Sequence, residues 1–190
     1  MYHFVCAIAR SPLVIVGIKC YCKLKVSLDR SQTKVILEVS PLTDTYDRRV
    51  QLRASSRRLE DAQALLYQKR WSGAMYLGGY AIECSLKSLI CYEEGRVNNF
   101  KDTRSFKKGL QGSDLHNLIK LLDCLNSLQR SIELDQTNSY REAWNTITSL
   151  WQNDKLRYSD KLGNEKDSRR FIEAVEKLHR FILDKQSKAS

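Results

Sequence analysis

The chain has 190 residues, of which 42% are hydrophobic and 28% are charged, and its 32 Lys and Arg residues exceed its 22 Asp and Glu residues to give a net charge of +10. This composition excludes an intrinsically disordered chain and predicts a folded domain large enough to bury a core. The positive charge favours anionic partners such as nucleic acid, but net charge does not determine a fold.

The first 45 residues differ in pattern from the rest. Both prolines, Pro12 and Pro41, lie in this part of the chain. Hydrophobic and polar residues alternate over 24–28 and over 35–39, with turn-forming residues between the two runs. Alternation with period two is typical of β-strands, so residues 1–45 are expected to be an N-terminal extension that forms a short β-hairpin or is poorly ordered. An isolated hairpin is marginal in water, which favours the second alternative.

Residues 46–186 are expected to form one helical domain. No proline occurs after Pro41, and proline is the strongest helix breaker. Hydrophobic residues recur there at helical spacing. The expected helices cover about 43–70, 73–94, 113–125, 138–151 and 167–186. The pattern predicts a mostly α fold, an up-and-down bundle of four or five helices.

The segment 73–94 is expected to be the central helix, because small and hydrophobic residues surround nearly its whole circumference. Ser72 stands where a helix cap is needed. Gly73, Gly78 and Gly79 each cost about 1 kcal/mol of helix stability relative to Ala. These glycines therefore indicate that neighbouring backbones approach this helix closely.

Four polar side chains share one face of the central helix. Glu83 and Lys87 are the only charged residues in its interior, and their four-residue spacing allows an ion pair. Tyr76 and Tyr80 extend the same face. Two interpretations stay open: an ion pair at the edge of the bundle, or a binding site, since a buried ion pair adds little net stability.

Three further positions are candidates for chemistry. His116 is expected in the first turn of the helix at 113–125, where a neutral imidazole suits a general base, although a capping or exposed histidine is the simpler alternative. Arg157 and Tyr158 follow the fourth helix and could fold back over the bundle or anchor the helix end. His179 is expected to be a packing or surface residue.

The loop 95–112 carries a dense group of positive side chains. Arg104, Lys107 and Lys108 are its candidates for contact with phosphate groups. A solvated loop with no ligand is the alternative.

Signatures of most enzyme and metal-binding classes are missing. The six cysteines and three histidines lack zinc-ligand spacing, and no glycine-rich phosphate loop occurs. No metal and no cofactor are therefore expected. Cysteines within apolar helical patterns fit a reducing, cytoplasmic location, and no apolar run reaches the ~18 residues of a membrane span.

Three segments, taken in order, resemble the HEPN family of small helical domains. The segment 70–87 ends in Ala-Ile-Glu-Cys-Ser-Leu-Lys, similar to the family pattern Ala-x-Glu-x-x-Leu-Lys. The segment 114–118, Asp-Leu-His-Asn-Leu, is similar to its His-(Asp/Asn)-Leu helix start, and 151–158 is similar to its Trp…Arg-Tyr segment. The resemblance covers about 50–185 and implies a helical bundle that often dimerises.

The resemblance also implies a role linked to nucleic acids or nucleotides. Many members are metal-independent RNases, commonly toxins of defence or toxin–antitoxin systems, and others partner a small nucleotidyltransferase. The RNase members carry an Arg followed, after four to six residues, by a His. Here Arg104 precedes His116 by 12 positions and Arg170 precedes His179 by nine, so this motif is not matched and nuclease activity does not follow from it.

Three hypotheses for function result. The first is a binding or accessory domain for RNA or a nucleotide, in a toxin–antitoxin or defence system, acting as a homodimer or with a nucleotidyltransferase or antitoxin partner and without a membrane. Its expected binding residues are Glu83, Lys87, Tyr80, Tyr158, Arg104, Lys107 and Lys108. The second is a metal-independent RNase toxin with His116 and Arg157 as catalytic residues. The third is a structural protein-interaction module.

Overall fold

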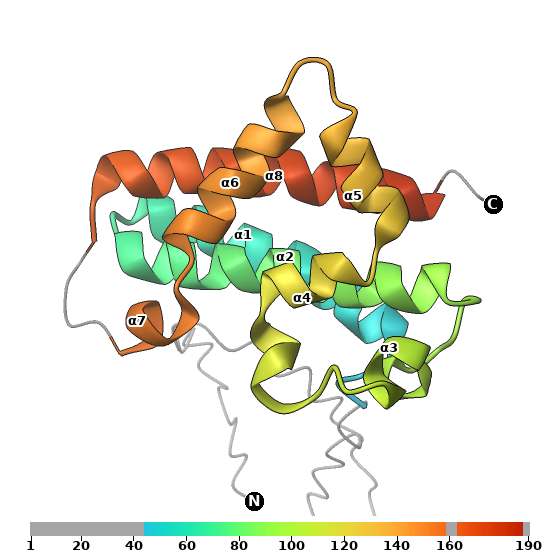
Figure 1. Ribbon diagram of the computed structural model, residues 1–190. Coiled ribbons are helices and arrows are strands. Elements are labelled where there is room, and N and C mark those ends of the chain that lie inside the picture. Colours follow the sequence, from blue (N-terminus) through green and yellow to red (C-terminus); the bar gives the residue numbers. More distant parts are fainter. Residues whose placement is uncertain (1–43, 159–162, 188–190) are drawn as a thin grey trace, which may run out of the picture. The chain divides into compact units, whose positions relative to one another are not determined.

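The computed structural model describes residues 44–158 and 163–187, and this part of the chain is mostly helical (Figure 1). It contains eight α-helices and two 3₁₀ turns. Their bounds are α1 Arg48–Tyr67, α2 Trp71–Glu93, η1 Phe100–Asp102, α3 Arg104–Lys107, η2 Gly112–His116, α4 Leu118–Asp123, α5 Asn126–Glu133, α6 Ser139–Leu150, α7 Asn153–Arg157 and α8 Glu165–Ser187. The predicted mostly α bundle is confirmed, whereas the β-hairpin expected before residue 40 lies outside the described residues.

Three short helices, α3, α5 and α7, account for the difference from the four or five helices expected. The segment expected to be one helix at 113–125 is instead the 3₁₀ turn η2 followed by α4. The side chain of Asn117 accepts hydrogen bonds from the backbone N–H groups of Ile119 and Lys120, at 3.0 and 3.2 Å, and so caps α4. His116 therefore ends the 3₁₀ turn η2, before this cap. The expectation that it lies in the first turn of the helix is wrong.

A short reversal joins α1 to α2. Asp47 caps α1 by accepting from the backbone N–H groups of Arg49 and Val50. Lys69 adopts a left-handed backbone conformation with φ of 59°, which turns the chain back after α1. As a result α2 already begins at Trp71, so the expectation that Ser72 caps it is wrong.

Helix α2 is the centre of the bundle, because other helices cover most of its surface. Figure 1 shows α1, α2 and α8 lying side by side, with α5 and α6 joined as a hairpin. The fully buried aliphatic side chains of α2 are Ile82, Leu86, Leu89 and Ile90. They pack against a hydrophobic face of α8 that includes Phe171, Ile172 and Leu178. An almost entirely apolar circumference thus corresponds to a buried helix, as the sequence predicts.

Two adjacent glycines let neighbouring aromatic residues reach the backbone of α2. A Cβ atom on Gly79 would lie 1.9–2.2 Å from three atoms of the Trp151 indole, and one on Gly78 would lie 3.0 Å from the Phe171 ring. The Trp151 Nε1–H group donates to the backbone oxygen of Tyr76 at 3.3 Å. The close approach inferred from the glycines is therefore made by side chains, chiefly by Trp151.

A buried polar contact joins α1 to α8. His179 Nε2 lies 3.0 Å from Ser55 Oγ, and both residues are buried. Ser55 Oγ donates its proton to the backbone oxygen of Leu52, so the imidazole must be the donor to Ser55. Burial lowers the pKa of His179 to about 4, which makes this a neutral packing histidine at neutral pH.

We expect Gly79→Ala to destabilise the domain by about 3 kcal/mol, because the new methyl group must displace a buried indole and break its hydrogen bond. Urea unfolding, together with the tryptophan emission spectrum, measures this. Gly73→Ala is the matched control on the same helix: its Cβ would meet only the flexible end of Leu65, at 3.3 Å, and the helix gains about 1 kcal/mol of propensity. Equal stability of the two variants would contradict the packing described.

We expect the free energy of unfolding to fall as pH drops from about 6.5 towards 4. In this range His179 binds a proton in the unfolded chain, where its pKa is about 6.5, but stays neutral in the folded chain, where its pKa is about 4. This contribution is complete above pH 6.5 and amounts to about 3 kcal/mol. Denaturant titrations of wild type and His179→Gln across this range isolate it, since the carboxylates are common to both proteins. Parallel pH profiles of the two proteins would refute the assignment.

Candidate functional site

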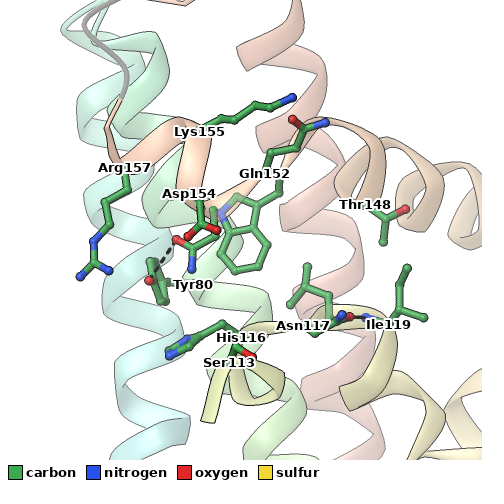
Figure 2. A pocket seen from close by; sticks show the side chains of 13 residues that line it. Tyr80, Ser113, His116, Asn117, Ile119, Thr148, Gln152, Asp154, Lys155 and Arg157 are labelled. Atoms are coloured by element: carbon green, nitrogen blue, oxygen red, sulfur yellow. Dashed lines mark hydrogen bonds between the residues drawn. The ribbon is translucent and has the colours of Figure 1, made fainter.

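A polar cavity of about 540 Å³ opens between α2, the η2–α4 junction and the α6–α7 junction (Figure 2). The residues that line it come from segments far apart in the chain. They are Tyr80, Ser113, His116, Asn117, Leu118, Ile119, Thr148, Trp151, Gln152, Asn153, Asp154, Lys155 and Arg157. Three of the predicted site residues, Tyr80, His116 and Arg157, therefore share one cavity.

A buried ion pair lies behind the cavity. Lys87 Nζ is 2.6 Å from Glu83 Oε1, and the two side chains are only 7% and 3% exposed. The i,i+4 spacing on α2 brings them together, as the sequence predicts. Burial of both charges makes their desolvation expensive, so their mutual attraction adds little net stability.

Glu83 also holds His116. The Nδ1 atom of His116 lies 3.1 Å from each carboxylate oxygen of Glu83. With Lys87 supplying the counter-charge, the carboxylate acts as acceptor, so the geometry places a proton on Nδ1 of His116. Nε2 is then the ring nitrogen left for a ligand, and the side chain is 46% exposed. A neutral imidazole oriented in this way can accept a proton.

A tyrosine pair forms the next layer of the cavity wall. The hydroxyl of Tyr80 donates to Asn153 Oδ1 at 3.2 Å and lies 3.5 Å from the hydroxyl of Tyr76. Burial raises the pKa of Tyr80 to about 12, so its phenol stays neutral. Its ring meets those of His116 and Trp151 edge to face, with centroids 6.2 and 5.6 Å apart. These contacts link α2 to both of the other walls.

Arg157 is the last residue of α7, and its side chain lies at the edge of the cavity beyond Tyr80, as Figure 2 shows. Its guanidinium carbon lies 5.8 Å from the centroid of the Tyr158 ring. Tyr158 itself is 78% exposed and is not among the lining residues. The predicted pair is thus divided: Arg157 belongs to the cavity wall, and Tyr158 covers part of the guanidinium from outside.

The three candidate residues of the basic loop 95–112 do not line this cavity. Arg104, Lys107 and Lys108 are exposed on and after α3. Arg104 Nε is 3.9 Å from Glu94 Oε2, and the Glu94 carboxylate accepts from the backbone N–H groups at the start of α3. Arg104 and Lys108 border a second hollow that also contains several carboxylates. Its acidic residues are Glu93, Glu94, Asp114 and Asp123. Contact of Arg104, Lys107 and Lys108 with phosphate groups stays a prediction.

Residues from the α6–α7 junction complete the cavity but were not expected from the sequence. Asn153 fixes the Tyr80 hydroxyl, and Trp151 forms the wall that rests on Gly79. The sequence singled out Gly78 and Gly79 as sites of close approach, but it gave no reason to expect Trp151 as the residue that packs there. Asn153 carried no signal, because its position depends on the short helix α7, which the sequence pattern did not predict.

The described residues offer little support for other classes of site. Within 44–158 and 163–187, no group of three or more His, Cys, Asp or Glu side chains is placed to hold a metal ion. No helix of the same ranges is both long and apolar enough to cross a bilayer.

The fold and the cavity define a small all-helical domain that presents a carboxylate-held histidine beside an arginine. A family model, the HEPN domain, matches residues 49–186, and the chain belongs to this family. No curated protein and no solved structure matches the chain. Family membership supports a role associated with RNA or nucleotides, or a ribonuclease-like role, at this general level.

Proposed function

We propose that the domain binds RNA or a nucleotide in the cavity at the α6–α7 junction. The observation that carries this proposal is the combination, in one cavity of about 540 Å³, of the cations Lys155 and Arg157 with the amide side chains of Gln152 and Asn153. Cations bind phosphate groups, while amides and hydroxyls recognise base edges and sugars. Asp154 is the one carboxylate in the lining, so the cavity keeps a positive balance.

Protein partners belong to the same proposal. The domain acts as a homodimer in the cytoplasm and works beside an antitoxin or a small nucleotidyltransferase, in a toxin–antitoxin or defence system. Support for this comes from membership of the HEPN family, through the roles that the resemblance described under Sequence analysis implies. Growth arrest on expression that a neighbouring gene relieves would favour a toxin, and an adjacent nucleotidyltransferase gene would favour the accessory role.

Arg157→Gln is expected to weaken binding of nucleoside monophosphates and of an oligouridylate by about tenfold, because a charge-assisted contact to phosphate is lost. Calorimetry for the nucleotides and filter binding for the RNA measure this. Arg170→Gln is the matched control: it removes the same charge from a different groove, between α6 and α8. Equal effects of the two substitutions, or no affinity in the wild type even at low salt, would refute the cavity as the site.

Metal-independent RNA cleavage is the second candidate, favoured by the Glu83–His116 contact in the same cavity as Arg157. His116 Nε2 would take the proton of a ribose 2′-hydroxyl, whose oxygen attacks the adjacent phosphorus while the 5′-oxygen of the next nucleotide leaves. Arg157 would stabilise the charge that develops on the phosphoryl oxygens. The departing 5′-oxygen would take a proton from water, and the His116 imidazolium would return its proton to solvent. The products would be a 2′,3′-cyclic phosphate and a 5′-hydroxyl.

RNA cleavage in the presence of EDTA is expected to fall by about 10²–10⁴-fold in His116→Ala, since a general base contributes this much. Glu83→Gln should reduce the rate less, because it loosens the orientation of the imidazole and leaves Nε2 in place. His179→Ala is the histidine control, since that residue is buried between α1 and α8. Cleavage that survives His116→Ala would remove this residue from the mechanism.

A further inference from the structure

The outer face of α1 carries a row of arginines that the cavity does not use. Arg49, Arg53 and Arg57 are all exposed and follow one another at intervals of four residues. On an α-helix this spacing places successive side chains on one face, about 6 Å apart along the axis. We name these three residues the α1 arginine row.

Among residues 44–158 and 163–187, no carboxylate forms an ion pair with the α1 arginine row. Within the described ranges, no ion pair or side-chain hydrogen bond is recorded for these three guanidinium groups, whereas the neighbouring Arg58 lies 3.5 Å from Asp61. Asp47 precedes the row, but its carboxylate accepts from backbone N–H groups at the start of α1. Glu60, one turn beyond Arg57, marks the end of the row.

An exposed aromatic ring lies on the same face. Tyr67 is 91% exposed, the highest value among the exposed large hydrophobic side chains. It follows Arg49 by 18 residues, or about five helical turns, so the two side chains point from the same side of α1. The ring lies about 15 Å beyond Arg57 along the helix, ten residues at 1.5 Å each. A row of cations with an exposed ring on the same helix face is a combination that binds single-stranded nucleic acid, since phosphates contact the cations and a base stacks on the ring.

We infer that the α1 arginine row and Tyr67 form a second contact surface, for the phosphate backbone of single-stranded RNA. This inference rests on the proposed function, which makes RNA the ligand, but it concerns a different face from the cavity. The positive charge of the row is complementary to a phosphate backbone, which carries one negative charge per nucleotide. An acidic protein surface is the competing partner that the experiment must distinguish.

The test measures how the affinity for RNA depends on salt. The probe is a fluorescein-labelled 2′-O-methyl oligouridylate, which lacks the 2′-hydroxyl needed for cleavage, and the protein is the full chain. Each phosphate contact contributes about −0.7 to the slope of log K against log salt for single strands. The triple variant Arg49→Gln, Arg53→Gln, Arg57→Gln should therefore have a slope about 2 smaller in magnitude than the wild type. Gln keeps good helix propensity, and circular dichroism checks folding.

Two matched variants sharpen the result. Arg170→Gln, Lys177→Gln, Arg180→Gln removes the same three charges from exposed positions of α8 and should leave most of the slope intact. Tyr67→Ala should lower affinity by about tenfold without changing the slope, because stacking releases no counterions.

The outcomes separate the two proposals. An unchanged slope in the triple α1 variant, with RNA still bound by the wild type, would overturn the surface and leave the cavity proposal standing. Equal losses of slope in the α1 and α8 variants would indicate diffuse attraction by net charge and would also overturn the α1 surface. Displacement of the RNA by poly-L-glutamate at equal charge would overturn it too. No RNA affinity in the wild type at low salt would overturn both proposals.

Discussion

The contact between Trp151 and Gly79 is the constraint on which the cavity depends. The indole occupies the space that any side chain larger than hydrogen at position 79 would fill, and its N–H group donates to the backbone of α2 at Tyr76. Trp151 is also the first of the two residues between α6 and α7. One contact therefore sets where both helices meet α2, and the hydrogen bond from Tyr80 to Asn153 depends on that position.

The charged group behind the cavity has a different physical character. Lys87 and Glu83 are both nearly fully buried, and the loss of hydration opposes their attraction. An aliphatic pair at the same positions would fill the core at lower cost. What the pair provides is a carboxylate in a dry setting, next to a half-exposed imidazole whose Nδ1 it holds. This is the arrangement expected where the orientation of a histidine matters more than the stability of a helix.

The sequence predicts the helical fold well, because absence of proline and helical periodicity are local properties. The sequence also predicts that Glu83 pairs with Lys87, since residues four positions apart on a helix lie on the same face. It fails where the answer depends on competition between neighbouring residues. The helix was expected to begin at about residue 113, but Asn117 caps α4, and this places His116 before the helix. It also fails where two distant segments must meet, as Gly79 and Trp151 do. The sequence shows that a glycine costs helix stability, but it does not show which residue packs against that glycine.

Charge shows most clearly what a sequence total leaves out. The net charge of +10 counts every base equally. In the structure Lys87 is compensated inside the core, Arg58 and Lys120 face carboxylates at the surface, and the basic loop borders a hollow rich in acids. The α1 arginine row and the cavity cations Lys155 and Arg157 form no ion pair within the described residues, and these two groups suit different tasks. Cations spaced along a helix attract a phosphate backbone without reading it, whereas a cation beside amides and a fixed hydroxyl can select the group that enters. Affinity and selectivity for an RNA ligand would thus be properties of separate faces of one small domain.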